Sequence, residues 1–178
     1  TLLAMEPTTK PVSTPATVRI ALAGDSTVTK GAGWGVGFAD HLQGDIKVMN
    51  FSQGGRSSRS FLNEGHWKKL LDSKPDYILI QFGHNDQPGK GPERETDPAT
   101  TYAEFLGRYI SDAQALGATP ILVTSIERRR WKDGKIDPTL TPYADAVRKL
   151  AAEKNVPLID MNARTIELYE RLGVDGCN

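Results

Sequence analysis

Short apolar segments alternate with amphipathic segments along this chain, and this alternation restricts the fold more than any other feature. Five apolar segments have the length of strands, at residues 18–23, 46–51, 77–82, 120–126 and 156–161. Helix-like segments follow them in turn, at residues 34–43, 58–71 (broken near Gly65), 101–116, 143–153 and 162–171. Such alternation predicts a parallel sheet with helices on both faces. We expect a three-layer α/β/α sandwich with five parallel strands in the order 2-1-3-4-5.

The chain has 178 residues, which suits one domain with a sizeable core. Residues 1–17 are rich in Thr and Pro and indicate a flexible lead-in, so we place the domain at residues 18–178. This start resembles that of a mature protein after signal-peptide removal, and we expect a secreted or periplasmic protein. The alternative is an arbitrary cut in a cytosolic protein.

Charge and composition argue against several partners. The 22 basic and 22 acidic residues give a net charge of zero, which offers no electrostatic attraction for nucleic acid or an anionic membrane. No apolar run approaches the roughly 20 residues that span a bilayer. The three histidines lack the paired spacing of a metal site, so we expect no metal. The single cysteine, Cys177, is either a disulfide partner or an incidental free thiol.

Polar groups follow each predicted strand, and a parallel sheet places its sites at the carboxyl ends of its strands. Ser26 follows the first strand at a sharp turn, which suits a nucleophile but equally suits a capping serine. Gly55 follows the second strand, where it offers an exposed backbone N–H or only a turn. Asn85 follows the third strand, where its amide could meet an oxyanion or cap a loop.

Nucleotide-binding patterns are absent from the sequence. The glycines at positions 31, 33, 35 and 37 do not have the spacing of the dinucleotide fingerprint, because only Gly24 closes the first strand. No glycine-led Gly-Lys-Ser/Thr motif occurs either. A phosphate or nucleotide binder of flavodoxin-like fold therefore remains a weak alternative, which the fold alone permits.

Three motifs occur in order at three successive strand ends. They are Gly24-Asp25-Ser26-Thr27, Gly54-Gly55-Arg56-Ser57 and Gly83-His84-Asn85-Asp86. Together they resemble the GDSL/SGNH hydrolase family, and they are most similar to its rhamnogalacturonan acetylesterase branch. The resemblance runs from about Val18 to the end of the chain. It implies the flavodoxin-like SGNH fold and hydrolysis of an ester through an acyl-serine intermediate, without a cofactor.

The resemblance implies a role for each motif position. Ser26 would be the nucleophile, and its own N–H, the Gly55 N–H and the Asn85 side chain would bind the oxyanion. Thr27, Arg56 and His84 are candidate substrate-binding residues, and Asp25 and Asp86 would hold the loops.

Arginines raise a separate expectation about substrate charge. The resemblance places Arg56 and the loop Arg128–Arg130 where a polyuronide carboxylate could be met. A solvated surface is the alternative role for most of these arginines.

One motif of the resembling family is missing. Its general base is the histidine of an Asp-x-x-His motif beyond the fifth strand, and no such motif follows Asp160 in this sequence. Three accounts remain open: an esterase without its last segment and C-terminal helix, a histidine from another chain, or a non-catalytic sugar-binding descendant. The first predicts an exposed apolar strip beside the first and fifth helices, through which the protein could self-associate.

The resulting hypothesis is a serine carboxylic-ester hydrolase. It would remove acetyl groups from a plant cell-wall polysaccharide such as rhamnogalacturonan. The main alternative is a carbohydrate-binding descendant that has lost turnover.

Overall fold

The computed structural model describes residues 17–177, so the predicted lead-in lies outside the described residues except for Thr17. The strands are β1 (Val18–Gly24), β2 (Ile46–Asn50), β3 (Tyr77–Gln81), β4 (Thr119–Val123), β5 (Trp131–Lys132), β6 (Lys135–Ile136) and β7 (Leu158–Ile159). The helices are α1 (Gly35–Asp40), α2 (Ser58–Asn63), α3 (His66–Asp72), α4 (Thr101–Ala115), α5 (Thr141–Lys154) and α6 (Met161–Gly176).

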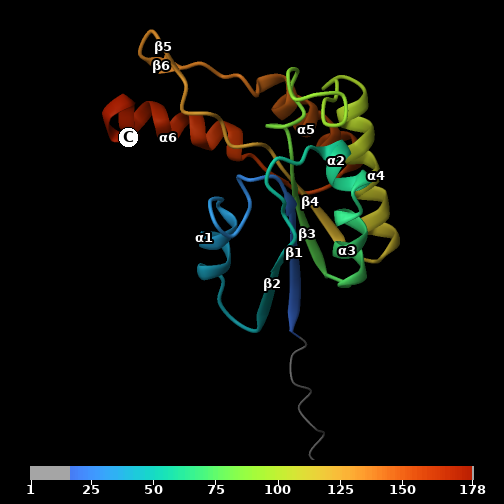
Figure 1. Ribbon diagram of the computed structural model, residues 1–178. Coiled ribbons are helices and arrows are strands. Elements are labelled where there is room, and N and C mark those ends of the chain that lie inside the picture. The colour runs from blue at the N-terminus through green and yellow to red at the C-terminus, as the bar shows by residue number, and fades with distance from the viewer. Residues whose placement is uncertain (1–16, 178) are drawn as a thin grey trace, which may run out of the picture.

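Five of the strands form one parallel sheet in the order β2-β1-β3-β4-β7. The predicted order is therefore confirmed, with β7 as the fifth strand. Strand β1 lies between β2 and β3, so the loops after these three strands leave the same edge of the sheet side by side (Figure 1). This topology brings the three sequence motifs together.

Helices cover both faces of the sheet, as the three-layer prediction requires. Helices α2, α3, α4 and α5 lie on one side, and α1 lies on the other (Figure 1). Alternate side chains of β1 and β3 serve the two cores: Ala21 and Ile78 pack with Phe61 and Tyr109, whereas Leu22 packs on the α1 side. Met161, at the start of α6, joins this second core. The burial of every central strand on both faces explains their continuous apolar sequences.

The C-terminal third differs most from the sequence prediction. The fifth strand was expected over residues 156–161, but β7 contains only Leu158 and Ile159. It ends there because the side chain of Asp160 accepts a hydrogen bond from the Ala163 N–H and so begins α6. The helix predicted over residues 162–171 begins one residue earlier, at Met161, and runs to Gly176. It has a kink at Gly173, where φ is +70°.

A small β-hairpin lies in the segment between β4 and α5. Strands β5 and β6 pair antiparallel across Asp133 and Gly134, which have φ of +50° and +76°. An Asp-Gly pair at positive φ is the preferred two-residue hairpin connection, so the sequence did contain this signal. The helix predicted over residues 143–153 follows as α5, which begins two residues earlier, with Leu140 at its N-cap.

An apolar strip was expected beside the first and fifth predicted helices, which correspond to α1 and α6. Large apolar side chains are exposed on these two helices and on β7. They are Val36 of α1, Leu158 and Ile159 of β7, and Leu168, Leu172 and Val174 of α6. Self-association through them remains a prediction. Cys177, in contrast, is buried and has no disulfide partner within residues 17–177. In the same residues, no helix combines the length and apolar character needed to cross a membrane.

The loop after β1 offers a matched test of its packing. A Cβ at Gly33 would overlap the Thr27 carbonyl group, well inside the 3.0 Å that real Cβ atoms keep, whereas a Cβ at Gly31 would meet nothing within 4 Å. We expect Gly33→Ala to lower the free energy of unfolding by about 2 kcal/mol, because backbone must move. Gly31→Ala should change it by less than about 0.5 kcal/mol. Denaturant titration of both variants measures this, and equal effects would contradict the packing described.

Candidate active site

The loops after β1 and β2 place Ser26 at the carboxyl edge of the sheet. Ser26 lies two residues beyond β1 and is exposed. The Gln53 N–H donates to the Gly24 carbonyl at 2.9 Å, which joins the second loop to the first. A Cβ built at Gly54 would lie 3.8 Å from the Ser26 Cβ. The second loop therefore runs directly beside the Ser26 side chain, and a Cβ at Gly54 would be in van der Waals contact with it.

Hydrogen-bond donors around Ser26 are left unused. Within residues 17–177, neither the Ser26 N–H nor the Gly55 N–H donates a hydrogen bond. The Asn85 amide donates one bond, to the Arg56 carbonyl at 3.1 Å, and keeps its second N–H free. Gly55 has φ of +78°, a conformation that suits glycine. Free donors held beside an exposed hydroxyl are what an oxyanion hole requires.

A chain of buried polar groups fixes the turn that carries Ser26. The Asp25 carboxylate accepts hydrogen bonds from the Thr27 N–H at 2.8 Å and from the Thr27 hydroxyl at 2.7 Å. That hydroxyl accepts from the Gln81 amide, whose oxygen in turn accepts from the Trp34 indole N–H. The Thr27 hydroxyl is thus committed inside the protein, and its substrate-binding role stays a prediction. Sequence analysis missed Gln81 and Trp34, although a glutamine at the end of an apolar strand was a usable signal.

His84 faces the other oxygen of the same carboxylate. Its Nδ1 lies 3.6 Å from Asp25 Oδ2, and both atoms are buried without a hydrogen-bond partner within residues 17–177. The pair therefore links the third loop to the turn of Ser26. His84 lies at the site as predicted, and its contact with substrate stays a prediction.

Asp86 ties the loop after β3 to the start of α2. Its fully buried carboxyl group accepts from the Ser58 N–H at 3.0 Å, from the Ser58 hydroxyl at 2.5 Å and from the Thr96 hydroxyl at 3.0 Å. Burial raises the pKa of Asp86 to about 6, although these hydrogen bonds act in the opposite direction. The structure thus gives Asp86 the loop-holding role that the resemblance implied.

Three buried tyrosines brace the same loops by hydrogen bonds to backbone carbonyls. The Tyr109 hydroxyl donates to the Ser58 carbonyl at 2.6 Å, and the Tyr143 hydroxyl donates to the Asp86 carbonyl at 3.0 Å. The Tyr102 hydroxyl donates to the Phe82 carbonyl at 2.7 Å. Burial raises the pKa of Tyr143 to about 12, so it stays a donor at ordinary pH. Hydrogen bonds from α4 and α5 in the helical core therefore help to fix the loops of the site.

The Arg56 side chain binds two neighbouring groups of the protein. Its Nε lies 2.8 Å from Glu64 Oε2, and its Nη1 donates to the Gly54 carbonyl at 3.0 Å. The hydrogen bond from Arg56 lowers the pKa of the Glu64 carboxyl below its usual value. Arg56 therefore shapes the second loop, and its contact with substrate stays a prediction.

The remaining histidines have partners away from Ser26. His66 lies 3.1 Å from Glu64 Oε2 and packs against the Phe61 ring, and the His41 Nδ1 contacts the Gly37 carbonyl at 2.6 Å. His66 and His41 are therefore engaged in local contacts. The described residues contain no group of three His, Cys, Asp or Glu side chains that could hold a metal ion.

Comparisons with known proteins show the family of this chain. The model of the GDSL-like Lipase/Acylhydrolase family matches residues 21–175. This chain belongs to that family. Its sequence is 41% identical over 166 residues to the rhamnogalacturonan acetylesterase RhgT of Bacillus subtilis, a match that covers 88% of this chain and 70% of RhgT.

Two solved structures resemble this GDSL-like chain. The protein YXIM_BACsu from Bacillus subtilis aligns with a TM-score of 0.75 at 27% identity, over 89% of this chain and 47% of that protein. This chain thus spans less than half of YXIM_BACsu. The acetylxylan esterase Axe2 from Geobacillus stearothermophilus aligns with a TM-score of 0.68 at 20% identity, over 85% of this chain and 79% of Axe2. The second likeness confirms the fold.

Asp86 leads to a prediction about stability and pH. Its pKa is about 6 in the folded protein and near 3.8 when unfolded, so between these values the folded state binds more protons. We expect its contribution to the free energy of unfolding to fall by about 2.4 kcal/mol as pH rises from 4 to 7. The difference between wild type and Asp86→Asn, measured by denaturant titration across this range, isolates that contribution.

The matched control is Asp40→Asn, which replaces an exposed carboxylate on α1. The free energy of unfolding of this control should change with pH in the same way as that of wild type. If the free energy of unfolding of Asp86→Asn also changed with pH as that of wild type does, the buried carboxyl would not have the raised pKa.

Proposed function

We propose that this protein is a serine esterase that removes acetyl groups from a carbohydrate, with rhamnogalacturonan as the leading substrate. The observation that supports the proposal is the exposed Ser26 hydroxyl at the edge of the sheet where the loops with the unused donors of Ser26, Gly55 and Asn85 meet. RhgT, a relative 41% identical, is a rhamnogalacturonan acetylesterase, which supports the choice of acyl group and polymer.

The chemistry follows from these groups. The Ser26 oxygen attacks the acetyl carbonyl carbon, its proton passes to a base, and the carbonyl oxygen becomes an oxyanion. The N–H groups of Ser26 and Gly55 and the free N–H of Asn85 stabilise that oxyanion. The C–O bond to the sugar then breaks, and the sugar oxygen takes up the proton. Water hydrolyses the acetyl-serine by the same route and releases acetate.

The general base that takes the Ser26 proton is not yet assigned to a residue. The 178 residues contain no Asp-x-x-His motif, and two of their three histidines have partners elsewhere. We expect the 178-residue chain alone to hydrolyse an aryl acetate much more slowly than the full product of its gene, because loss of one triad member leaves only the oxyanion hole and binding.

Either result with the 178-residue chain is informative. Full activity of this chain alone would contradict that expectation and would place the base within it. His84→Ala would then be the variant to test, because His84 is the histidine at this edge of the sheet.

Replacement of the nucleophile tests the proposal itself. In the full gene product, Ser26→Ala should abolish hydrolysis of aryl acetate and release of acetate from rhamnogalacturonan. Ser111→Ala is the matched control, because Ser111 is exposed on α4 and bonds only within its helix. Saccharide binding that persists without any Ser26-dependent turnover would favour the non-catalytic alternative.

The oxyanion hole makes a separate prediction. Asn85→Ala should lower kcat by about 10²-fold to 10³-fold with little change in KM, because the donor acts on charge that appears in the transition state. Asn63→Ala, at the exposed end of α2, should leave kcat unchanged. A loss confined to KM would assign Asn85 to substrate binding instead.

A further inference from the structure

We propose that a cationic hollow beside the site binds a carboxylate of the polysaccharide. This inference rests on the proposed esterase function and adds an anionic subsite to it. The hollow has a volume of about 430 Å³. Its lining residues are Gln87, Pro88, Lys90, Arg128, Arg130 and Thr139.

The lining carries three cations and no acidic side chain. Within residues 17–177, neither the Lys90 ammonium nor the Arg128 guanidinium has a carboxylate within 4.0 Å, whereas Arg130 is paired with Asp137 at 2.9 Å. The buried Glu127 carboxylate accepts from the Arg128 backbone N–H at 3.0 Å, and not from its guanidinium. Two of the three cations thus lack a charged partner in a protein whose net charge is zero. A concave surface lined by one sign of charge attracts ligands of the opposite sign.

Arg128 is held in place by neutral acceptors. Its Nη1 donates to the Thr139 hydroxyl at 3.0 Å and its Nη2 donates to the His84 carbonyl at 3.3 Å. A guanidinium has five N–H groups, so three remain for a ligand. The planar group can bind a carboxylate through two parallel hydrogen bonds. Because Arg128 is already oriented, binding costs less side-chain entropy.

Arg128 also connects the hollow to the nucleophile. It contacts the His84 carbonyl, and the His84 ring lies 3.6 Å from the carboxylate of Asp25, the residue before Ser26. A larger hollow of about 550 Å³ adjoins the cationic one and shares Gln87, Pro88 and Thr139 with it. The lining of the larger hollow also includes Glu95 and Asp97, so the cationic character is confined to the smaller hollow.

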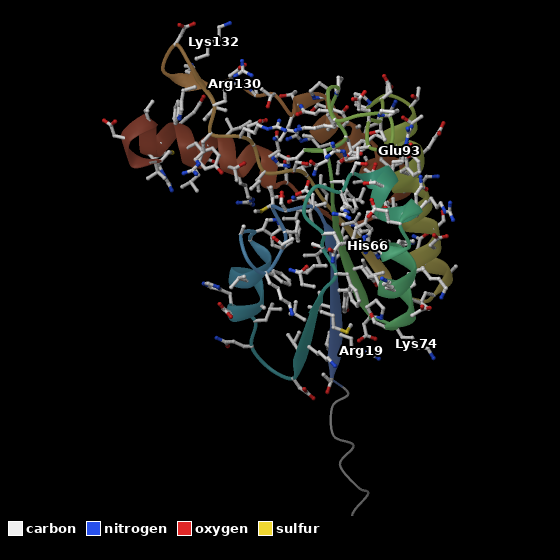
Figure 2. The ribbon with its side chains drawn as sticks, in the orientation of Figure 1. Arg19, His66, Lys74, Glu93, Arg130 and Lys132 are labelled. Atoms are coloured by element: carbon white, nitrogen blue, oxygen red, sulfur yellow. The ribbon has the colours of Figure 1, made fainter. Side chains whose placement is uncertain are left out.

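Other arginines are less suited to this role. Arg56 is paired with Glu64, and Arg129 donates to the Cys177 carbonyl. Arg130 and the hairpin that follows it lie at the end of the molecule where the strands finish, whereas Arg19 lies at the opposite end (Figure 2). Arg130 is itself paired with Asp137, so Arg128 is the arginine of the predicted loop that suits this role, together with Lys90.

The test compares two substrates that differ only in charge. One is an acetylated rhamnogalacturonan oligosaccharide, and the other is the same oligosaccharide with its carboxylates reduced to alcohols. With the full gene product, kcat/KM should be about tenfold higher for the acidic form, the order expected of one charge-assisted hydrogen bond. The preference should shrink as salt is raised.

Variants locate the subsite. Lys90→Gln and Arg128→Gln should each lower the ratio of kcat/KM between the acidic and reduced substrates severalfold. Lys132→Gln, on the exposed hairpin and outside the lining, is the matched control and should keep the wild-type ratio. Lys90 makes no hydrogen bond through its side chain within the described residues, so its variant remains informative if Arg128→Gln fails to fold.

Two outcomes separate the two proposals. If wild type hydrolyses both oligosaccharides equally well, or if Lys90→Gln and Arg128→Gln keep the wild-type ratio, the anionic subsite is wrong and the esterase proposal stands. If neither oligosaccharide nor an aryl acetate is hydrolysed in a Ser26-dependent way, the esterase proposal itself is wrong.

Discussion

The buried carboxyl group of Asp86 holds together parts of the site that the sheet alone would leave loose. Parallel strands bring their loops to one edge, but they do not fix how one loop sits against the next. Asp86 does so by accepting hydrogen bonds from Ser58 at the start of α2 and from Thr96 in the loop before α4. Its removal from water is costly, and the raised pKa measures that cost. The hydrogen bonds offset part of it and make the arrangement specific.

Most residues of the three motifs bind other parts of the protein and fix the geometry of the loops. Asp25 holds the turn before Ser26, Thr27 joins that turn to Gln81, and Arg56 orders the second loop against Glu64. The groups left free are the Ser26 hydroxyl and a few N–H donors. This division is physically sensible, because a donor stabilises a transition state only if its orientation is fixed before the reaction.

Charge is distributed unevenly around the site although the chain as a whole is neutral. The arginines differ in their partners: Arg56 and Arg148 face carboxylates, whereas Arg128 faces a hydroxyl and a carbonyl. The hydrogen bonds between Arg148 and Asp160 hold the pKa of that carboxyl near 2 and secure the start of α6. A guanidinium with only neutral partners keeps its charge available for a ligand. The amino-acid composition does not reveal which arginines have such partners.

The sequence by itself determined the parallel sheet, the order of its strands and the three motifs at its edge. It could do so because doubly covered strands need continuous apolar runs, and because loops after neighbouring parallel strands must meet. Local signals were less reliable near the C-terminus, where Asp160 ended β7 early and the Asp133-Gly134 turn was overlooked. There the strands are only two residues long, so a single cap or turn decides their limits.

Only the tertiary structure decided which side chains are committed and which are free. Gln81 reaches Thr27 across 54 positions of the chain, and Arg128 reaches the His84 carbonyl across 44. Such partners follow from the packing of whole elements, and a motif of four residues cannot specify them. The free N–H groups beside Ser26 have the same origin, because a donor is free only when the completed fold brings it no acceptor.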